Sequence, residues 1–160
     1  MINGKQVNEN DECYTPKYIF DALECEFDLD VASPVDRTHC NVPANYFISE
    51  GSLDKDWHGF VWMNPPYSGR NGKSKWLDKM YSHGNGIALF PDSTSSDWWQ
   101  IAAKQADCIL FLKDRIKFVY KDGTIGKQPA NGSCLFAYGE EAIIALVKAE
   151  INGIGIILKR

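Results

Sequence analysis

The sequence predicts an α/β domain whose sheet is mainly parallel with an antiparallel C-terminal edge. Short apolar runs typical of strands alternate with segments of helical pattern, which favours strand–helix–strand units. The 160 residues, 44% of them hydrophobic, are enough for one core, so we expect a single domain over residues 1–160. Three strand-like runs end at Asp30, Asn64 and Pro91. Because ligands of such sheets bind beyond the carboxyl ends of the strands, we expect the site there.

The first half of the chain supplies three expected strands and two helices. Residues 1–12 are polar, and we expect them to be loosely held. Thr15-Pro16 pairs an N-cap residue with a proline at the first helical position, so a helix is predicted through about Cys25. A second helix is expected over 73–82, before the Gly84-Asn85-Gly86 turn. Apolar or alternating runs predict strands at residues 27–31, 45–48 and 60–63.

The second half continues the alternation. Ser95 or Ser96 is expected to cap a helix through Lys104. A Lys121-Asp122-Gly123 turn suggests that the segments on either side of it form a hairpin. Glu140-Glu141 favours the start of a last helix, because carboxylates stabilise the positive end of a helix dipole. Apolar runs predict strands at residues 87–90, 108–112, 116–120, 133–138 and 154–158.

Residues 64–67 read Asn-Pro-Pro-Tyr directly after the apolar run at 60–63, and this tetrapeptide is the most informative part of the chain. Proline donates no backbone N–H and restricts the residue before it to extended conformations, so the strand must stop in a rigid loop. In that loop the Asn64 side-chain oxygen and the Pro65 carbonyl can each accept one N–H, while Tyr67 stacks on a ring face. The set suits the exocyclic amino group of a flat, conjugated ring.

The chemistry implied by this loop is an attack by that amino group. Drawing both hydrogens out of the ring plane frees the nitrogen lone pair, and the electrophile would be a methyl sulfonium. The tetrapeptide is also compatible with a simple turn, because Asn and Pro are turn formers. By average composition, however, it arises by chance in about one chain in a thousand of this length, and its place after a strand favours the catalytic interpretation.

Weaker segments surround the tetrapeptide between about Tyr14 and Tyr138. They are Thr15-Pro16, residues 27–32, Leu53 with 57–59, residues 61–63 directly before the tetrapeptide, residues 89–91 with Trp98-Trp99, and residues 115–118. In this order they resemble the small phage- and prophage-encoded DNA adenine-N6 methyltransferases, the Dam-like phage enzymes. The resemblance implies a Rossmann-like fold that uses S-adenosyl-L-methionine and acts on adenine N6 of a base flipped out of the duplex.

The resemblance also implies roles for particular residues. The catalytic loop comprises Asn64, Pro65, Pro66 and Tyr67. For the cofactor, Asp30 faces the methionine moiety, Thr15-Pro16 flanks it, and Glu50 is a candidate for the ribose or the adenine. Larger methyltransferases have glycines after the first strand, whereas residues 31–36 contain none, as in the small phage group. Asp30 is also compatible with a cap of the following turn, and Glu50 with a solvated loop carboxylate.

The net charge of −4 argues against a nucleic-acid partner unless the charges are unevenly distributed. Acidic residues crowd the first third of the chain, whereas basic residues gather between 69 and 127, which allows one positive face. We expect double-stranded DNA to contact Arg70, Lys73, Lys75, Arg115 and Lys117. The alternative is that the basic stretch is only a solvated edge. No long insertion is available as a separate target-recognition domain, so we expect recognition to use short loops, a second copy of the chain or very short target sites.

The composition argues against membrane, secreted and metal-binding proteins. No apolar run is long enough to span a bilayer and the N-terminus lacks a signal-peptide pattern, so we expect a protein without membrane contact, in the cytoplasm of a bacterial host if it is phage-encoded. The five cysteines form no C-x-x-C pair, and we expect no metal site.

Three amino groups fit the same loop: adenine N6, cytosine N4 and the side-chain amide of a protein glutamine. A glutamine methyltransferase agrees with the acidic net charge, but glutamine has no ring for Tyr67 to stack on. A DNA-binding protein that keeps the fold without catalysis would be expected to have a broken tetrapeptide or to lack Asp30, and neither is the case. We therefore predict a DNA adenine-N6 methyltransferase.

Overall fold

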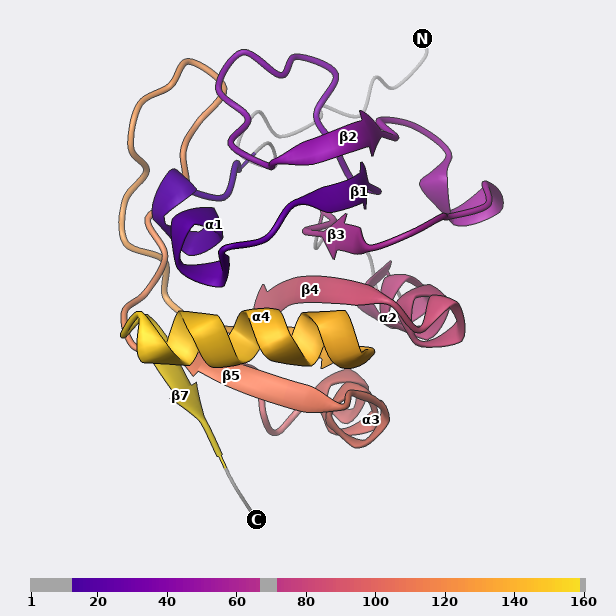
Figure 1. The fold of residues 1–160 in the computed structure, drawn as a ribbon. Coiled ribbons are helices and arrows are strands. Elements are labelled where there is room, and N and C mark those ends of the chain that lie inside the picture. Colours follow the sequence, from indigo (N-terminus) through magenta and orange to yellow (C-terminus); the bar gives the residue numbers. More distant parts are fainter. Residues whose placement is uncertain (1–12, 67–71, 159–160) are drawn as a thin grey trace, which may run out of the picture.

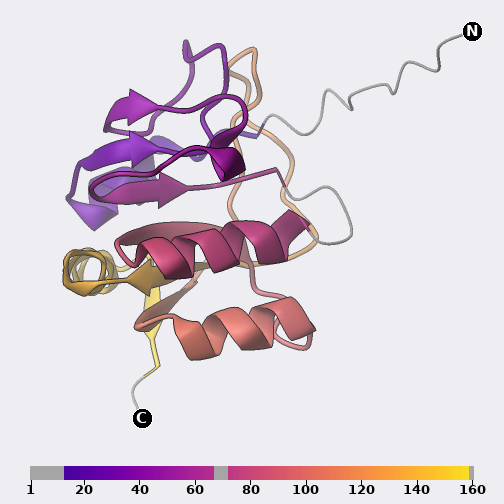
Figure 2. The same ribbon diagram turned by 90° about the vertical axis from the view of Figure 1, so that its right-hand side faces the viewer.

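The computed structural model describes residues 13–66 and 72–158, which form an α/β architecture of three layers (Figures 1 and 2). Within these residues the sheet has seven strands in the order β2-β1-β3-β4-β6-β5-β7. The strands are β1 (Phe27–Asp30), β2 (Ala44–Phe47), β3 (Val61–Met63), β4 (Gly86–Pro91), β5 (Cys108–Leu112), β6 (Ser133–Tyr138) and β7 (Gly155–Ile157). Each lies within two residues of a predicted strand.

Four α-helices in the described part cover the two faces of the sheet. They are α1 (Lys17–Leu23), α2 (Gly72–His83), α3 (Asp97–Gln105) and α4 (Glu140–Ile151). Helices α1 and α4 lie on one face, and α2 and α3 lie on the other (Figures 1 and 2). Strand β3 divides its side chains accordingly, since Trp62 packs on the α1–α4 side while Val61 and Met63 pack on the α2–α3 side.

One half of the sheet is parallel and the other half is antiparallel, whereas a mainly parallel sheet with an antiparallel edge was expected. Strands β2, β1, β3 and β4 run parallel. Strand β6 is antiparallel to both β4 and β5, and β7 is antiparallel to β5. The expected antiparallel strands are therefore not confined to an edge, because β6 lies inside the sheet. All six residues of β6 are buried, which is typical of a strand with neighbours on both sides and a covered surface on both faces.

Two local expectations were wrong in detail. Residues 116–120 do not form a strand; the 113–132 connection makes only isolated bridges, from Val119 to Tyr14 and to Ile125. The 121–123 turn is present, because the Gly123 N–H bonds to the Tyr120 carbonyl at 2.9 Å. Helix α1 begins one residue after Pro16, and no side chain caps it, so Thr15 does not serve as the expected cap.

The strand directions bring the expected residues together. Figure 2 shows the arrowheads of β1, β2 and β3 pointing toward the side where the 113–132 connection lies. Asp30 ends β1, Asn64 follows β3 and Pro91 ends β4, so all three lie at this carboxyl edge. None of the helices in the described ranges is long and apolar enough to cross a membrane.

The pairing of β3 with β4 gives a test of the fold at Gly86. A Cβ atom there would lie 2.5 Å from the Val61 carbonyl oxygen of β3 and 3.0 Å from the end of the Met80 side chain. We expect Gly86→Ala to lower the free energy of unfolding by about 1–3 kcal/mol, because an added methyl group must displace the strand backbone. Gly72→Ala is the control, since a Cβ at Gly72 meets no atom of the described residues within 4 Å. Urea unfolding of both variants measures the difference, and equal stability would contradict this packing.

Candidate active site

A cavity of about 830 Å³ opens at the carboxyl edge of the sheet. This volume is in the range of small-molecule sites. Segments from across the sequence line it: residues 13–15, 30–35, 49–52 and 64–66, with Pro91, Phe118 and residues 129–133. The segments that follow β1 and β2 form one wall, and the segment that precedes β6 contributes to another. Asn64 and Pro65 follow β3, which pairs with β1 on one side and β4 on the other.

Asn64 is held in a defined orientation. Its side-chain Nδ2 donates a hydrogen bond to the Thr15 hydroxyl oxygen at 3.1 Å, and Thr15 is only 3% exposed. The atom of this amide that can accept an N–H from a ligand is therefore Oδ1. Pro65 is buried and Pro66 is exposed, so the loop turns toward the surface directly after Pro65. The predicted partners Tyr67 and Arg70 lie outside the described residues.

Asp30 is a buried acid in the wall of the cavity. Its side chain is almost fully enclosed, with 2% of the residue exposed. Burial raises the pKa of the Asp30 carboxyl to about 6, while the Ala32 N–H and the Arg37 guanidinium act in the opposite direction. Oδ1 accepts the Ala32 N–H at 3.3 Å, which is the bond that a cap of the following turn would make. Asp30 thus has the geometry of a turn cap and also a carboxylate that favours a nearby cation.

Arg37 is a residue of this site that the sequence interpretation missed. Its guanidinium bonds to Asp30 Oδ2 at 3.4 Å and to the Ser33 hydroxyl, and it lies 3.7 Å from the centroid of the Phe47 ring. Ser33 is itself 5% exposed. A signal was present, because Arg37 is the only Lys or Arg between Glu26 and Glu50 and a buried carboxylate requires a compensating charge.

The other expected cofactor residues occupy different positions. Glu50 lines the cavity and is exposed, which places it at the rim. Thr15 also lines the cavity, but its hydroxyl faces Asn64. Pro16 does not line the cavity and instead precedes the first turn of α1.

Residues 129–133 form a wall that sequence reasoning did not identify. Gly132 makes this wall possible, because a Cβ atom there would lie 2.3 Å from an Asp92 carboxylate oxygen. The Asp92 N–H also bonds to the Gly132 carbonyl at 3.1 Å, which joins the end of β4 to the start of β6. No spacing in the sequence relates this segment to Asn64, since only the insertion of β6 beside β4 brings it there.

The described basic residues that were expected to contact DNA do not line the cavity. Neither Lys73 nor Lys75, in the first turn of α2, is part of its lining. Arg115 and Lys117 are exposed on either side of the fully buried Ile116, so both face solvent. The Arg115 guanidinium reaches the Pro129 carbonyl at 3.4 Å. Because Pro129 lines the cavity, Arg115 contacts the wall of the cavity from outside.

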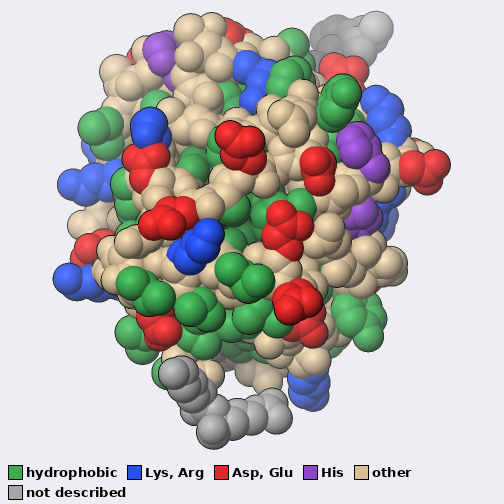
Figure 3. All heavy atoms as spheres, in the orientation of Figure 1, with side chains coloured by type: hydrophobic (Ala, Val, Ile, Leu, Met, Phe, Trp, Pro, Cys, Tyr) green, Lys and Arg blue, Asp and Glu red, His purple; other side chains and the backbone are tan. Residues whose placement is uncertain are grey.

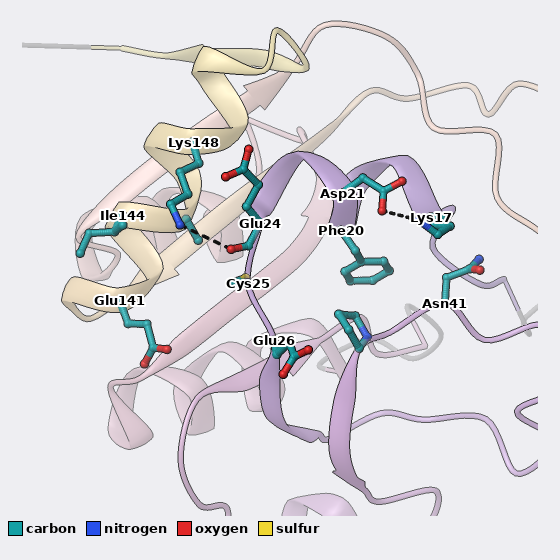
Figure 4. Close-up of a pocket in the computed structure, with 12 residues that line it drawn as sticks. Lys17, Phe20, Asp21, Glu24, Cys25, Glu26, Asn41, Glu141, Ile144 and Lys148 are labelled. Carbon is teal, nitrogen blue, oxygen red and sulfur yellow. Dashed lines mark hydrogen bonds and ion pairs between the residues drawn. The ribbon is translucent and has the colours of Figure 1, made fainter.

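A second cavity, of about 820 Å³, lies between α1 and α4 (Figure 4). Carboxylates gather over this face of the molecule (Figure 3). Both lysines of the groove already contact oxygen atoms (Figure 4). Lys17 forms an ion pair with Asp21 in α1, and Lys148 donates to the carbonyl of Glu24, the residue that follows α1. Burial raises the pKa of the Cys25 thiol to about 12, which leaves it unreactive at neutral pH. The groove thus contains neither Asn64 nor a reactive nucleophile, so the candidate active site is the cavity at the carboxyl edge.

Comparison with known proteins gives one finding. A family model described as DNA N-6-adenine-methyltransferase (Dam) matches residues 4–149. The matched range includes every segment that lines the cavity at the carboxyl edge. Comparisons with curated proteins and with solved structures gave no match.

The buried Asp30 predicts an unusual pH dependence of stability. Its pKa is about 6 in the folded chain against an ordinary value of 3.8, so the folded state holds its proton more tightly than the unfolded state does. This contribution to stability is fully present below about pH 4 and is lost as the pH rises through about 6. Asp30→Asn mimics the protonated carboxyl and should not show this loss.

Urea unfolding of the chain and of Asp30→Asn between pH 4 and pH 7 measures the effect. The free energy of unfolding of the variant, relative to the unaltered chain, should rise over this range by up to about 3 kcal/mol. Loss of the Arg37 partner adds only a difference that does not depend on pH here, because Arg stays charged. Parallel pH profiles would show that Asp30 keeps an ordinary pKa.

Proposed function

The chain belongs to the DNA N-6-adenine-methyltransferase (Dam) family, and we propose that it transfers a methyl group from S-adenosyl-L-methionine to N6 of an adenine flipped out of duplex DNA. The family assignment confirms the resemblance deduced from the sequence. One observation carries the proposal beyond the family: Asn64, bound through Nδ2, lies in a cavity whose walls come from both sides of β3. A cavity of this kind can hold two ligands against one amide.

The target amino group would be held by Asn64 and Pro65. Asn64 Oδ1 would accept one N–H of the amino group and the Pro65 carbonyl the other, which draws the hydrogens out of the ring plane and takes the nitrogen lone pair out of conjugation with the ring. S-adenosyl-L-methionine supplies a methyl group on a positively charged sulfur when it is bound. A bond from the nitrogen to the methyl carbon would form as the S–C bond breaks, which would leave S-adenosylhomocysteine, and the nitrogen would then release one proton to solvent. Tyr67 is proposed to stack on the ring and Pro66 to stiffen the loop.

The cofactor suits the wall that contains Asp30. A buried carboxylate whose pKa is raised by burial is stabilised by a nearby cation, and the methionine part of the cofactor carries an ammonium group. Asp30 is thus proposed to face that ammonium. Glu50, at the rim, is proposed to accept hydrogen bonds from the ribose hydroxyls. Thr15 flanks this wall, whereas Pro16 would act only by fixing the backbone beside Thr15.

The base would occupy the part of the cavity between Asn64 and residues 129–133. A flipped base needs phosphate contacts close to the mouth of its pocket. The exposed pair Arg115 and Lys117 meets this need, because Arg115 is tied to Pro129 in the same wall. Lys73 and Lys75 in the first turn of α2, together with Arg70, are proposed to add contacts from the other side. A positive edge would then hold DNA although the chain is acidic overall.

The direct test of the activity is incubation with unmethylated DNA and methyl-labelled S-adenosyl-L-methionine, followed by digestion to nucleosides. We expect label on N6-methyladenine. Asn64→Ala should lower turnover by about a hundredfold, the size expected for removing one acceptor that acts in the transition state. Asn45→Ala, an exposed amide on the edge strand β2, is the matched control and should methylate normally. Label on cytosine or on protein, or full activity of Asn64→Ala, would contradict the proposal.

The basic pair predicts a salt effect on DNA binding. Each phosphate contact that is removed lowers the slope of log K against log salt by about one. Replacing Arg115 and Lys117 together with Ala should weaken binding and flatten that slope by about two, while cofactor affinity stays the same. A double Lys55→Ala and Lys104→Ala variant removes the same charge from exposed positions outside the cavity. An equal loss in both double variants would mean that only net charge matters.

A further inference from the structure

Thr15 lies at the start of α1 but makes its side-chain contact with the catalytic loop. Its hydroxyl oxygen accepts the hydrogen bond from Asn64 Nδ2 at 3.1 Å, across 49 positions of sequence. We propose that Thr15 is a positioning residue for methyl transfer, which holds the Asn64 amide so that Oδ1 is aimed at the target amino group. This inference rests on the proposed function and assigns Thr15 a task other than binding the cofactor.

The helix does not use the Thr15 hydroxyl. A Thr-Pro pair before a helix predicts that the hydroxyl caps the first turn. Here the N-cap position is taken by Pro16, and no side chain caps α1. The hydroxyl can therefore be removed without taking a hydrogen bond from the helix. The contact with Asn64 is the bond that its loss would break.

Thr15 is itself held on both sides. The preceding residue, Tyr14, exchanges two backbone hydrogen bonds with Val119, at 2.8 and 2.9 Å. The Thr15 carbonyl accepts a hydrogen bond from Asn41 Nδ2 at 3.2 Å. Pro16 then fixes its own φ at −68°. With 3% of the residue exposed, Thr15 presents its hydroxyl from a rigid and enclosed segment.

The orientation of an amide matters more than its position in this reaction. The terminal torsion of Asn is broad and roughly two-fold, so the oxygen and nitrogen can exchange places at little intrinsic cost. In the exchanged orientation Nδ2 would face the N–H of the target amino group, donor against donor. The Thr15 hydroxyl can accept from Nδ2 or donate to Oδ1, so its bond to Asn64 restrains rotation of the amide out of its plane. Without the hydroxyl this restraint is lost, the amide torsion varies more widely and turnover falls.

Two substitutions separate the hydroxyl from the shape of the side chain. Thr15→Val keeps the branched shape and loses the hydroxyl, whereas Thr15→Ser keeps the hydroxyl. At saturating DNA and S-adenosyl-L-methionine we expect kcat to fall about tenfold in Thr15→Val, the effect of one net hydrogen bond, and to stay within about twofold in Thr15→Ser. Cofactor affinity by calorimetry should match the unaltered chain in both. In an Asn64→Ala background, Thr15→Val should have no further effect.

The opposite results overturn the inference. Unchanged kcat in Thr15→Val, or an equal fall in Thr15→Ser, would show that the hydroxyl does not position Asn64. Unchanged kcat with weaker cofactor binding would make Thr15 a cofactor anchor instead. Circular dichroism verifies folding of each variant, and Thr15→Ala replaces Thr15→Val if the latter fails to fold.

A readout without turnover separates this inference from the proposed function. The side-chain amide signals of Asn64, assigned by their loss in Asn64→Ala, should exchange with solvent more slowly in the unaltered chain and in Thr15→Ser than in Thr15→Val. Equal exchange in all three would overturn the positioning role even if the chain methylates DNA. If the chain methylates no DNA, the proposed function fails, and the exchange rates still decide whether Thr15 holds Asn64.

Discussion

The site depends on where β3 ends. This strand lies between β1 and β4 in the parallel half of the sheet, and Pro65 and Pro66 have no N–H with which to continue its pairing. The chain must therefore leave the sheet at Asn64, while β1 and β4 end close by at Asp30 and Pro91. Three parallel strands thus stop at one edge, and the cavity opens there. The position of Asn64 therefore follows from the backbone hydrogen bonding of β3, which ends where the two prolines begin.

The second constraint is the buried charge of Asp30. Enclosing a carboxylate costs several kcal/mol unless it is paired and hydrogen-bonded. Arg37, Ser33 and the Ala32 N–H supply part of that compensation. The pKa nevertheless stays raised, at about 6, so the carboxylate is not fully compensated by these groups. The groove between α1 and α4 differs, because its carboxylates line an open acidic face together with two lysines that already contact oxygens.

Local patterns were enough to predict the seven strands of the sheet, the loop after β3 and the acid at the end of β1, although the strand expected at 116–120 does not form. Each of these depends on residues adjacent in sequence, such as the two prolines after an apolar run. Arg37, Gly132 and the 129–133 wall depend on which strands become neighbours, and the insertion of β6 between β4 and β5 was not predicted. Thr15 shows the limit most clearly. Its sequence context predicts a helix cap, whereas its hydroxyl bonds to a loop 49 positions away.

The central claim is that one cavity, at the carboxyl edge of the sheet, holds the cofactor against Asp30 and presents it to Asn64. A crystal structure with S-adenosylhomocysteine, the product left after methyl transfer, tests this directly. We predict that its ammonium group lies at the Asp30 carboxylate and its sulfur faces Asn64. Ligand bound in the groove between α1 and α4, or in the cavity with its amino acid part away from Asp30, would contradict the account.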